Sequence, residues 1–178
     1  MNLLPYLRMP FAFFGHSMGA LVGFELARKL MRDHNLSPVH LFVSGCSAPQ
    51  MRPEHPVTYN LPDEELIEDL RRLEGTPGEV LEHPELLRLM LPLIRADFSV
   101  CQTYTYEDGA RLGCPITAYT GIEDRDVTRQ SVEAWGEQTT GRFVMRTFPG
   151  GHFFLNTSES VVLRMLWHEL ENILRRLG

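Results

Sequence analysis

A glycine-flanked serine, Gly15-His16-Ser17-Met18-Gly19, lies between an apolar run and a helical pattern. The apolar run at 10–14 ends at Gly15, which is typical of a short buried strand. Residues 18–32 then follow helical spacing, with basic residues in the last turns. In this context a G-x-S-x-G motif predicts a sharp turn that projects the serine hydroxyl above a sheet. Ser17 is therefore the candidate nucleophile.

The rest of the chain alternates between strand and helix patterns, which favours a mostly parallel sheet in an α/β fold. Apolar or β-branched runs at 39–45, 115–120 and 143–148 predict three more strands. The last amphipathic helix covers 160–177. We expect its buried side to consist of Leu163, Leu166, Leu170 and Leu174.

The stretch from about 50 to 107 has a different character, because it contains helical patterns and no strand pattern. Pro62 and the acidic residues after it suit the first turn of one helix. A second helical pattern follows, which we expect Pro84 and Pro92 to interrupt. The interpretation is one domain, 1–178, with a helical lid at about 50–107 packed on the sheet.

Composition and charge exclude several other classes of protein. With 17 Lys+Arg against 23 Asp+Glu and no basic stripe, the net charge is −6, and we expect no nucleic-acid partner. The apolar runs are shorter than the roughly 20 residues of a bilayer span, so we expect no membrane partner. The 3 cysteines form no C-x-x-C pair, which disfavours disulfides and zinc and favours a cytoplasmic location. We expect neither a cofactor nor a metal.

A serine nucleophile needs a histidine that accepts its proton and a carboxylate that orients the histidine. With this kind of motif the chain order is serine, carboxylate, histidine. His152 lies in a Gly-rich turn directly after a strand pattern and is the candidate base. The turn after the 115–120 strand offers Glu123, Asp124 and Asp126. Local spacing favours Asp124, with Asp126 next.

The backbone around the serine has an expected role of its own. The N–H of Met18, the residue after Ser17, should donate a hydrogen bond to the oxyanion that forms during acyl transfer. The positive end of the helix that begins there supports the same charge. His16 occupies the variable position of the motif, where we expect a packed residue that shapes the turn.

Taken together, the chain resembles the type II thioesterases, the stand-alone editing enzymes of nonribosomal peptide and polyketide assembly lines. The resemblance covers essentially the whole chain and is carried by GHSMGALVGFELAR, LPDEELIEDLRRLEGTPGEVL, PELLRLMLPLIRADF, TGIEDRDV, AWGEQT and RTFPGGHFFL. It implies an α/β-hydrolase fold with a helical lid. It also implies that Ser17 is the nucleophile, His152 the base and Asp124 the orienting acid, because the family's G-x-x-D turn falls on 121–124.

The resemblance further implies the reaction, which is hydrolysis of acyl thioesters on the phosphopantetheine arm of an acyl or peptidyl carrier protein. Such hydrolysis removes stalled or aberrant acyl groups in antibiotic and other secondary-metabolite biosynthesis. The alternatives are a general carboxylesterase with the same triad and an inactive fragment that only docks a carrier protein.

Two groups of lid residues are candidates for contacts with such a substrate. An apolar set would line the acyl chamber, although an apolar helix stripe is also typical of plain core; it comprises Met90, Leu91, Leu93, Ile94 and Phe98. A basic set would dock an acidic carrier protein, or simply form a solvated helix face; it comprises Arg71, Arg72, Arg88 and Arg95.

The position of the serine departs from the family pattern. Relatives of this kind place several strands before the serine, together with a loop that supplies the second oxyanion N–H. Here the serine is already residue 17. We therefore expect N-terminal strands to be missing, through a late start, a fragment, a degenerate gene product or a shortened active enzyme. One sheet edge would then be exposed, and the activity of this chain would be weak.

Overall fold

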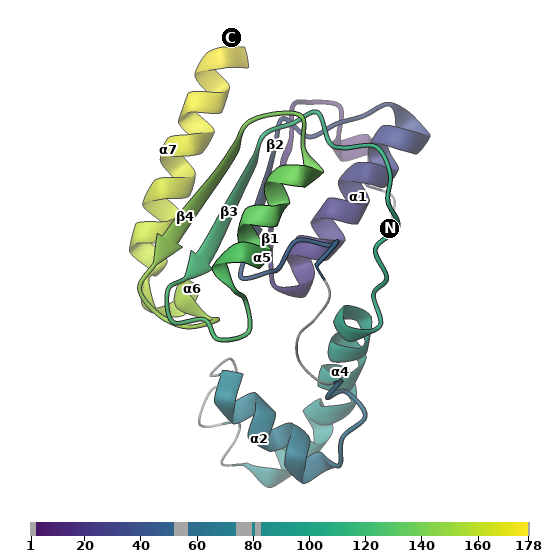
Figure 1. Ribbon diagram of the computed structural model, residues 1–178, viewed down its shortest axis with the longest axis vertical. Helices are drawn as coiled ribbons and strands as arrows, with labels where there is room; N and C mark the ends of the chain where they lie inside the picture. The colour runs from purple at the N-terminus through teal and green to yellow at the C-terminus, as the bar shows by residue number, and fades with distance from the viewer. Residues whose placement is uncertain (1–2, 52–56, 74–79, 81–82, 178) are drawn as a thin grey trace.

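The computed structural model describes residues 3–51, 57–73, 80 and 83–177, and its centre is a sheet of four parallel strands (Figure 1). The strands lie side by side in chain order: β1 (Ala12–His16), β2 (His40–Ser44), β3 (Ile116–Gly121) and β4 (Phe143–Phe148). The predicted α/β class and all four predicted strands are confirmed, with strand ends that shift by at most two residues.

Helices cover both faces of this sheet, as a parallel sheet requires. One face packs against α1 (Met18–His34), α5 (Arg129–Glu133) and the 3-10 turn η2 (Ala134–Gln138). The other face packs against α6 (Phe154–Thr157) and α7 (Glu159–Leu177). A short 3-10 turn, η1 (Leu4–Tyr6), precedes β1.

The alternation of side chains along β2 divides the core in two. Leu41 and Val43 belong to the cluster that contains Phe24 of α1 and Trp135 of η2. Phe42, between them in sequence, belongs to the opposite cluster under α7. All residues of β2 are buried, and its three central residues, Leu41, Phe42 and Val43, are apolar on both faces of the sheet.

The buried side of α7 differs from the predicted leucine stripe. Leu166 and Leu170 do pack against the sheet, but Leu163 and Leu174 are 55% and 66% exposed. The buried side is centred instead on Val162, with Met165, Leu166, Leu170 and Ile173. The two exposed leucines lie roughly a quarter turn away from this centre around the helix.

Between β2 and β3 the chain forms α2 (Asp63–Leu73) and α4 (Pro84–Gln102), which lie beyond the ends of the strands (Figure 1). These helices have a small core of their own, in which Leu66, Leu70 and Leu91 are buried. Residues 52–56, 74–79 and 81–82 of the expected lid lie outside the described residues.

The predicted interruption at Pro92 is wrong, because α4 runs without a break from Pro84 to Gln102. The predicted interruption at Pro84 is confirmed, since residue 80 is helical, His83 is extended and a new helix begins at Pro84. Pro84 stands in the first turn, where no backbone N–H is needed. Pro92 removes one helical hydrogen bond to the carbonyl of Arg88. Arg88 and Pro92 are both exposed, so water can donate a hydrogen bond to the carbonyl of Arg88.

In the part of the chain that the structure describes, no helix is both long and apolar enough to cross a bilayer.

Trp135→Ala should lower the free energy of unfolding by about 3–5 kcal/mol, the usual loss for a large buried aromatic. Trp135 is fully buried, its Nε1 donates to the carbonyl of Cys46 at 2.9 Å, and its ring meets Phe24 edge to face at 5.3 Å. Urea unfolding measures the loss. Trp167→Ala is the matched control, because Trp167 is 65% exposed and should contribute about 0.5 kcal/mol or less. Equal losses in the two variants would contradict this account of the core.

Candidate active site

The turn at Ser17 joins β1 directly to α1 and has a backbone that side chains rarely adopt. Ser17 has φ 52° and ψ −120°. A Cβ on Gly15 would lie 2.1 Å from the carbonyl oxygen of Gly19, so the residue at position 15 must be glycine. A Cβ on Gly19 would meet nothing within 4 Å. The sharp turn therefore depends on Gly15 and on the strained Ser17, and not on the second glycine of the motif.

The turn after β4 places His152 beside the end of β3. Gly150 has φ 112°, a conformation that favours glycine. A Cβ on Gly121 would lie 2.3 Å from the carbonyl oxygen of Gly151 and 2.4 Å from that of Gly150. The carbonyl of Gly150 also accepts the backbone N–H of Glu123 at 3.0 Å. This close backbone contact joins the two segments that carry His152 and the candidate carboxylates.

The structure brings Ser17, His152 and Asp124 into one hydrogen-bonded chain. His152 Nε2 lies 3.1 Å from Ser17 Oγ, and His152 Nδ1 lies 2.9 Å from Asp124 Oδ2. The side chain of Asp124 is fully buried, and that of His152 is 11% exposed. This geometry lets the histidine accept a proton from the serine while the carboxylate fixes the orientation of the ring.

The carboxylate that meets His152 is Asp124, and the other two predicted candidates lie elsewhere. Asp124 Oδ1 accepts the backbone N–H groups of Asp126 at 3.0 Å and Val127 at 3.2 Å. Glu123 is exposed. Asp126 lines the neighbouring cavity, and its backbone helps to hold Asp124. The turn thus satisfies both oxygens of a buried carboxylate.

Met18 begins α1 and lines the same cavity as Ser17. The N–H groups of the first helical turn have no acceptor within the helix, and the helix dipole adds partial positive charge there. The backbone at Met18 is therefore suited to stabilise negative charge that forms above Ser17.

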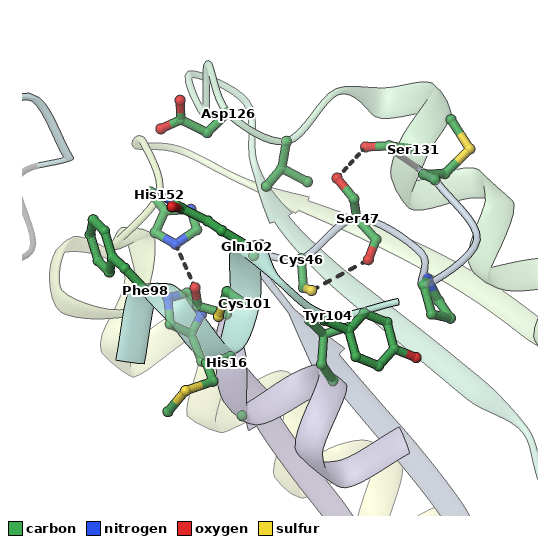
Figure 2. A pocket seen from close by; sticks show the side chains of 18 of the residues that line it. His16, Cys46, Ser47, Phe98, Cys101, Gln102, Tyr104, Asp126, Ser131 and His152 are labelled. Carbon is green, nitrogen blue, oxygen red and sulfur yellow. Dashed lines mark hydrogen bonds between the residues drawn. The ribbon is translucent and has the colours of Figure 1, made fainter. Parts of the chain in front are cut away.

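A cavity of about 520 Å³ lies between the serine turn and the C-terminal half of α4. Figure 2 shows Phe98, Cys101 and Gln102 of α4 at its wall, together with His152. Ser17 is also part of the wall. A pocket of this size is typical of small-molecule sites.

Of the five apolar lid residues predicted to line this cavity, Phe98 does so. Leu91 is buried in the core between α2 and α4, and Ile94 packs against that core. Leu93 is 63% exposed. Neither Leu93 nor Met90 lines the cavity, so the predicted stripe mostly serves the core of the lid.

Sequence reasoning missed the residues that follow β2. Cys46, Ser47 and Met51 line the cavity beside Ser17. The signal was available, because ligand sites in parallel sheets lie at the carboxyl ends of strands, and β2 ends at Ser44.

Two thiols in this wall are poor competitors for Ser17. Burial raises the pKa of the Cys46 thiol to about 12. Burial also raises the pKa of Cys101. Both thiols therefore stay protonated near neutral pH, and the thiolate is the nucleophilic form. Among the residues that the structure describes, no group of three or more His, Cys, Asp or Glu side chains is arranged to hold a metal ion.

Two of the basic residues predicted to dock an acidic partner already have acidic partners on the lid. Arg71 pairs with Glu68 at 3.1 Å, and Arg95 pairs with Asp63 at 2.5 Å. Arg88 is exposed, and the side chain of Arg72 lies outside the described part.

Comparisons with known proteins agree with the sequence resemblance. A thioesterase domain family model matches residues 3–170. The gramicidin S biosynthesis protein GrsT of Aneurinibacillus migulanus is 48% identical over 97% of this chain. The solved type II thioesterase BorB, from the borrelidin biosynthetic cluster, is 42% identical with a TM-score of 0.83 over 94% of this chain and 70% of its own. ClbQ, from the colibactin NRPS/PKS pathway, is 30% identical with a TM-score of 0.90 over 99% of this chain and 74% of its own.

The chain spans 68% of GrsT, and 66% and 54% of two other curated relatives. The matched relatives include type II thioesterases of biosynthetic clusters, and their solved structures share the α/β-hydrolase type of fold. Because the family model covers most of the chain and GrsT is similar over nearly all of it, the chain belongs to the thioesterase domain family.

Proposed function

We propose that this chain hydrolyses acyl thioesters, with Ser17 as the nucleophile, His152 as the general base and Asp124 as the orienting acid. The hydrogen-bonded chain of these three side chains, with distances of 3.1 and 2.9 Å, carries the proposal. It lies at the wall of a cavity large enough for a substrate. The protonated thiols of Cys46 and Cys101 support the choice of serine as the nucleophile.

In the first half-reaction Ser17 Oγ attacks the thioester carbonyl carbon, and its proton passes to His152 Nε2. The Met18 N–H stabilises the tetrahedral oxyanion. The carbon–sulfur bond then breaks, and the departing thiolate takes the proton from His152. The products are a free thiol and an acyl ester on Ser17.

In the second half-reaction a water molecule attacks that ester while His152 accepts one of its protons. The bond between the acyl carbon and Ser17 Oγ breaks, and His152 returns the proton to the serine. A carboxylic acid leaves, and the enzyme is restored. Asp124 remains ionised throughout and stabilises the imidazolium.

The proposed substrates are stalled or aberrant acyl groups on the phosphopantetheine arm of an acyl or peptidyl carrier protein. The proposed setting is nonribosomal peptide or polyketide biosynthesis, because BorB and ClbQ come from such clusters. An acidic carrier would meet exposed Arg88, since Arg71 and Arg95 are paired. The cysteines Cys46, Cys101 and Cys114 are free, which supports a reducing compartment such as the cytoplasm.

A fluorophosphonate probe should modify Ser17 in this 178-residue chain, because such probes react with an activated serine. Peptide mass spectrometry locates the adduct. Ser17→Ala and His152→Ala should abolish labelling, whereas Ser160→Ala, an exposed serine on α7, should leave it unchanged. Absence of an adduct on Ser17 in the folded chain would contradict the proposal.

Asp124→Asn should slow probe labelling far more than Asp126→Asn. The loss expected for Asp124 is on the order of 10³–10⁴-fold, because the orienting carboxylate holds the correct histidine tautomer. Asp126→Asn keeps the backbone N–H that supports Asp124, so a loss below about tenfold is expected. Labelling rates of the two purified variants make the comparison. A larger loss in Asp126→Asn would transfer the role to that residue.

The choice of substrate distinguishes a thioesterase from a general carboxylesterase with the same triad. We expect kcat/KM for an acetylated phosphopantetheinyl carrier protein to exceed kcat/KM for p-nitrophenyl acetate. Release of free thiol and of nitrophenol measures the two reactions, with Ser17→Ala as the blank. Faster turnover of the oxygen ester would favour the carboxylesterase. Carrier binding without any release that depends on Ser17 would favour a docking module.

A further inference from the structure

His16 lies directly beside the proposed base. The centroid of its ring is 5.2 Å from that of His152, and the two planes are tilted by 51°. Figure 2 shows the two rings close together. Both nitrogens of His152 are engaged by Ser17 and Asp124, so His16 meets that ring through packing and not through a hydrogen bond.

The His16 ring is itself held from two sides. His16 Nδ1 lies 3.0 Å from Ser44 Oγ at the end of β2. A Cβ on the next residue, Gly45, would lie only 2.6 Å from His16 Cε1, so the ring packs against the backbone of that glycine. The carbonyl of Ser44 also accepts the N–H of Ser17 at 2.8 Å. The end of β2 therefore positions both the proposed nucleophile and the His16 ring.

His16 is neutral under ordinary conditions. Burial, and then the neighbouring His152, lower the pKa of His16 to about 4, against an opposing effect of Asp124. Because of this low pKa, His16 is a poor base and does not compete with His152 for the serine proton. Because its ring is neutral, it does not repel the imidazolium that forms on His152. His16 Nε2 is buried and has no hydrogen-bond partner within the described structure. That nitrogen therefore holds no other part of the fold together.

We propose that His16 is a positioning residue for His152, an inference that rests on the proposed function. The neutral ring of His16, fixed by Ser44 and Gly45, limits the rotation of the His152 ring and keeps Nε2 at Ser17 Oγ. This restraint matters because the base must keep its geometry while it gains and loses a proton. A displacement of about 1 Å in such a constellation lowers the rate on the order of 10²-fold.

The aromatic residues after His152 complete the restraint. The Phe153 ring lies 5.0 Å from His152 and 5.5 Å from His16. Phe154 is fully buried and meets His16 edge to face at 6.1 Å. The three rings of His16, His152 and Phe153 thus contact one another in pairs. Removal of the His16 ring, which Ser44 and Gly45 hold in place, therefore lets the His152 ring rotate.

The test measures the second-order rate constant for fluorophosphonate labelling of Ser17 at neutral pH, normalised to the fraction of molecules that label. His16→Phe keeps a planar ring and should label within about threefold of wild type, because ring packing persists. His16→Ala should label on the order of 10²-fold more slowly. If His16→Ala does not fold, His16→Leu replaces it, since leucine fills the space without a planar ring.

Rescue by a ring separates positioning from a merely structural role. The labelling rate lost in His16→Ala or His16→Leu should be recovered in His16→Phe, because the proposed restraint depends on ring packing. Ile116→Ala is the control for lost stability, because Ile116 is fully buried at the start of β3, whereas Asp124 follows the other end of that strand. It should leave the normalised rate unchanged.

Each outcome bears on a different claim. Wild-type labelling at Ser17 with an unchanged rate in the Ala or Leu variant would overturn the role of His16 and leave the proposed function standing. A folded His16→Phe variant that labels as slowly as His16→Ala would also overturn the role of the ring. Failure of the wild-type chain to label at Ser17 would overturn the proposed function and this inference with it.

Discussion

Parallel pairing of the four strands is the constraint on which the site depends. Because the strands run in one direction and lie in chain order, their carboxyl ends meet at one edge of the sheet. Ser17 follows β1, Asp124 follows β3 and His152 follows β4. β2 lies between β1 and β3 and ends at Ser44, whose carbonyl accepts the backbone N–H of Ser17. Residues more than one hundred positions apart thereby come within hydrogen-bond distance.

Close backbone approach then adjusts this arrangement. Gly15 lets β1 turn into α1 against the carbonyl of Gly19, and Gly121 lets the end of β3 touch the turn at 150–151. At both places a side chain would collide with backbone, which cannot move away as a flexible side chain can. The buried carboxylate of Asp124 is stable here because His152 and two backbone N–H groups contact its oxygens.

Much of this arrangement was predictable from local patterns. The strand runs, the serine turn and the Gly-rich turn at His152 are short-range features, so propensity and spacing indicate them directly. Features that depend on neighbours were harder to predict. Leu163 and Leu174 fit an amphipathic stripe equally well but lie outside the contact with the sheet. Pro92 suggested an interruption, yet its exposed side of α4 tolerates the missing hydrogen bond.

By itself the sequence determined the α/β class, the order of the elements and the candidates Ser17 and His152, because each is marked by residues within a few positions of it. Local spacing and the family's G-x-x-D turn favoured Asp124 over Asp126, but the contact of Asp124 with His152 depends on how the turn folds back on Gly150, which only the tertiary structure decided. The tertiary structure also decided that Phe98 lines the cavity while Leu91 builds the lid core. The position of His16 beside His152 has the same origin. His16 ends β1 and His152 follows β4, which are the two edge strands of the sheet, so no local pattern encodes their contact.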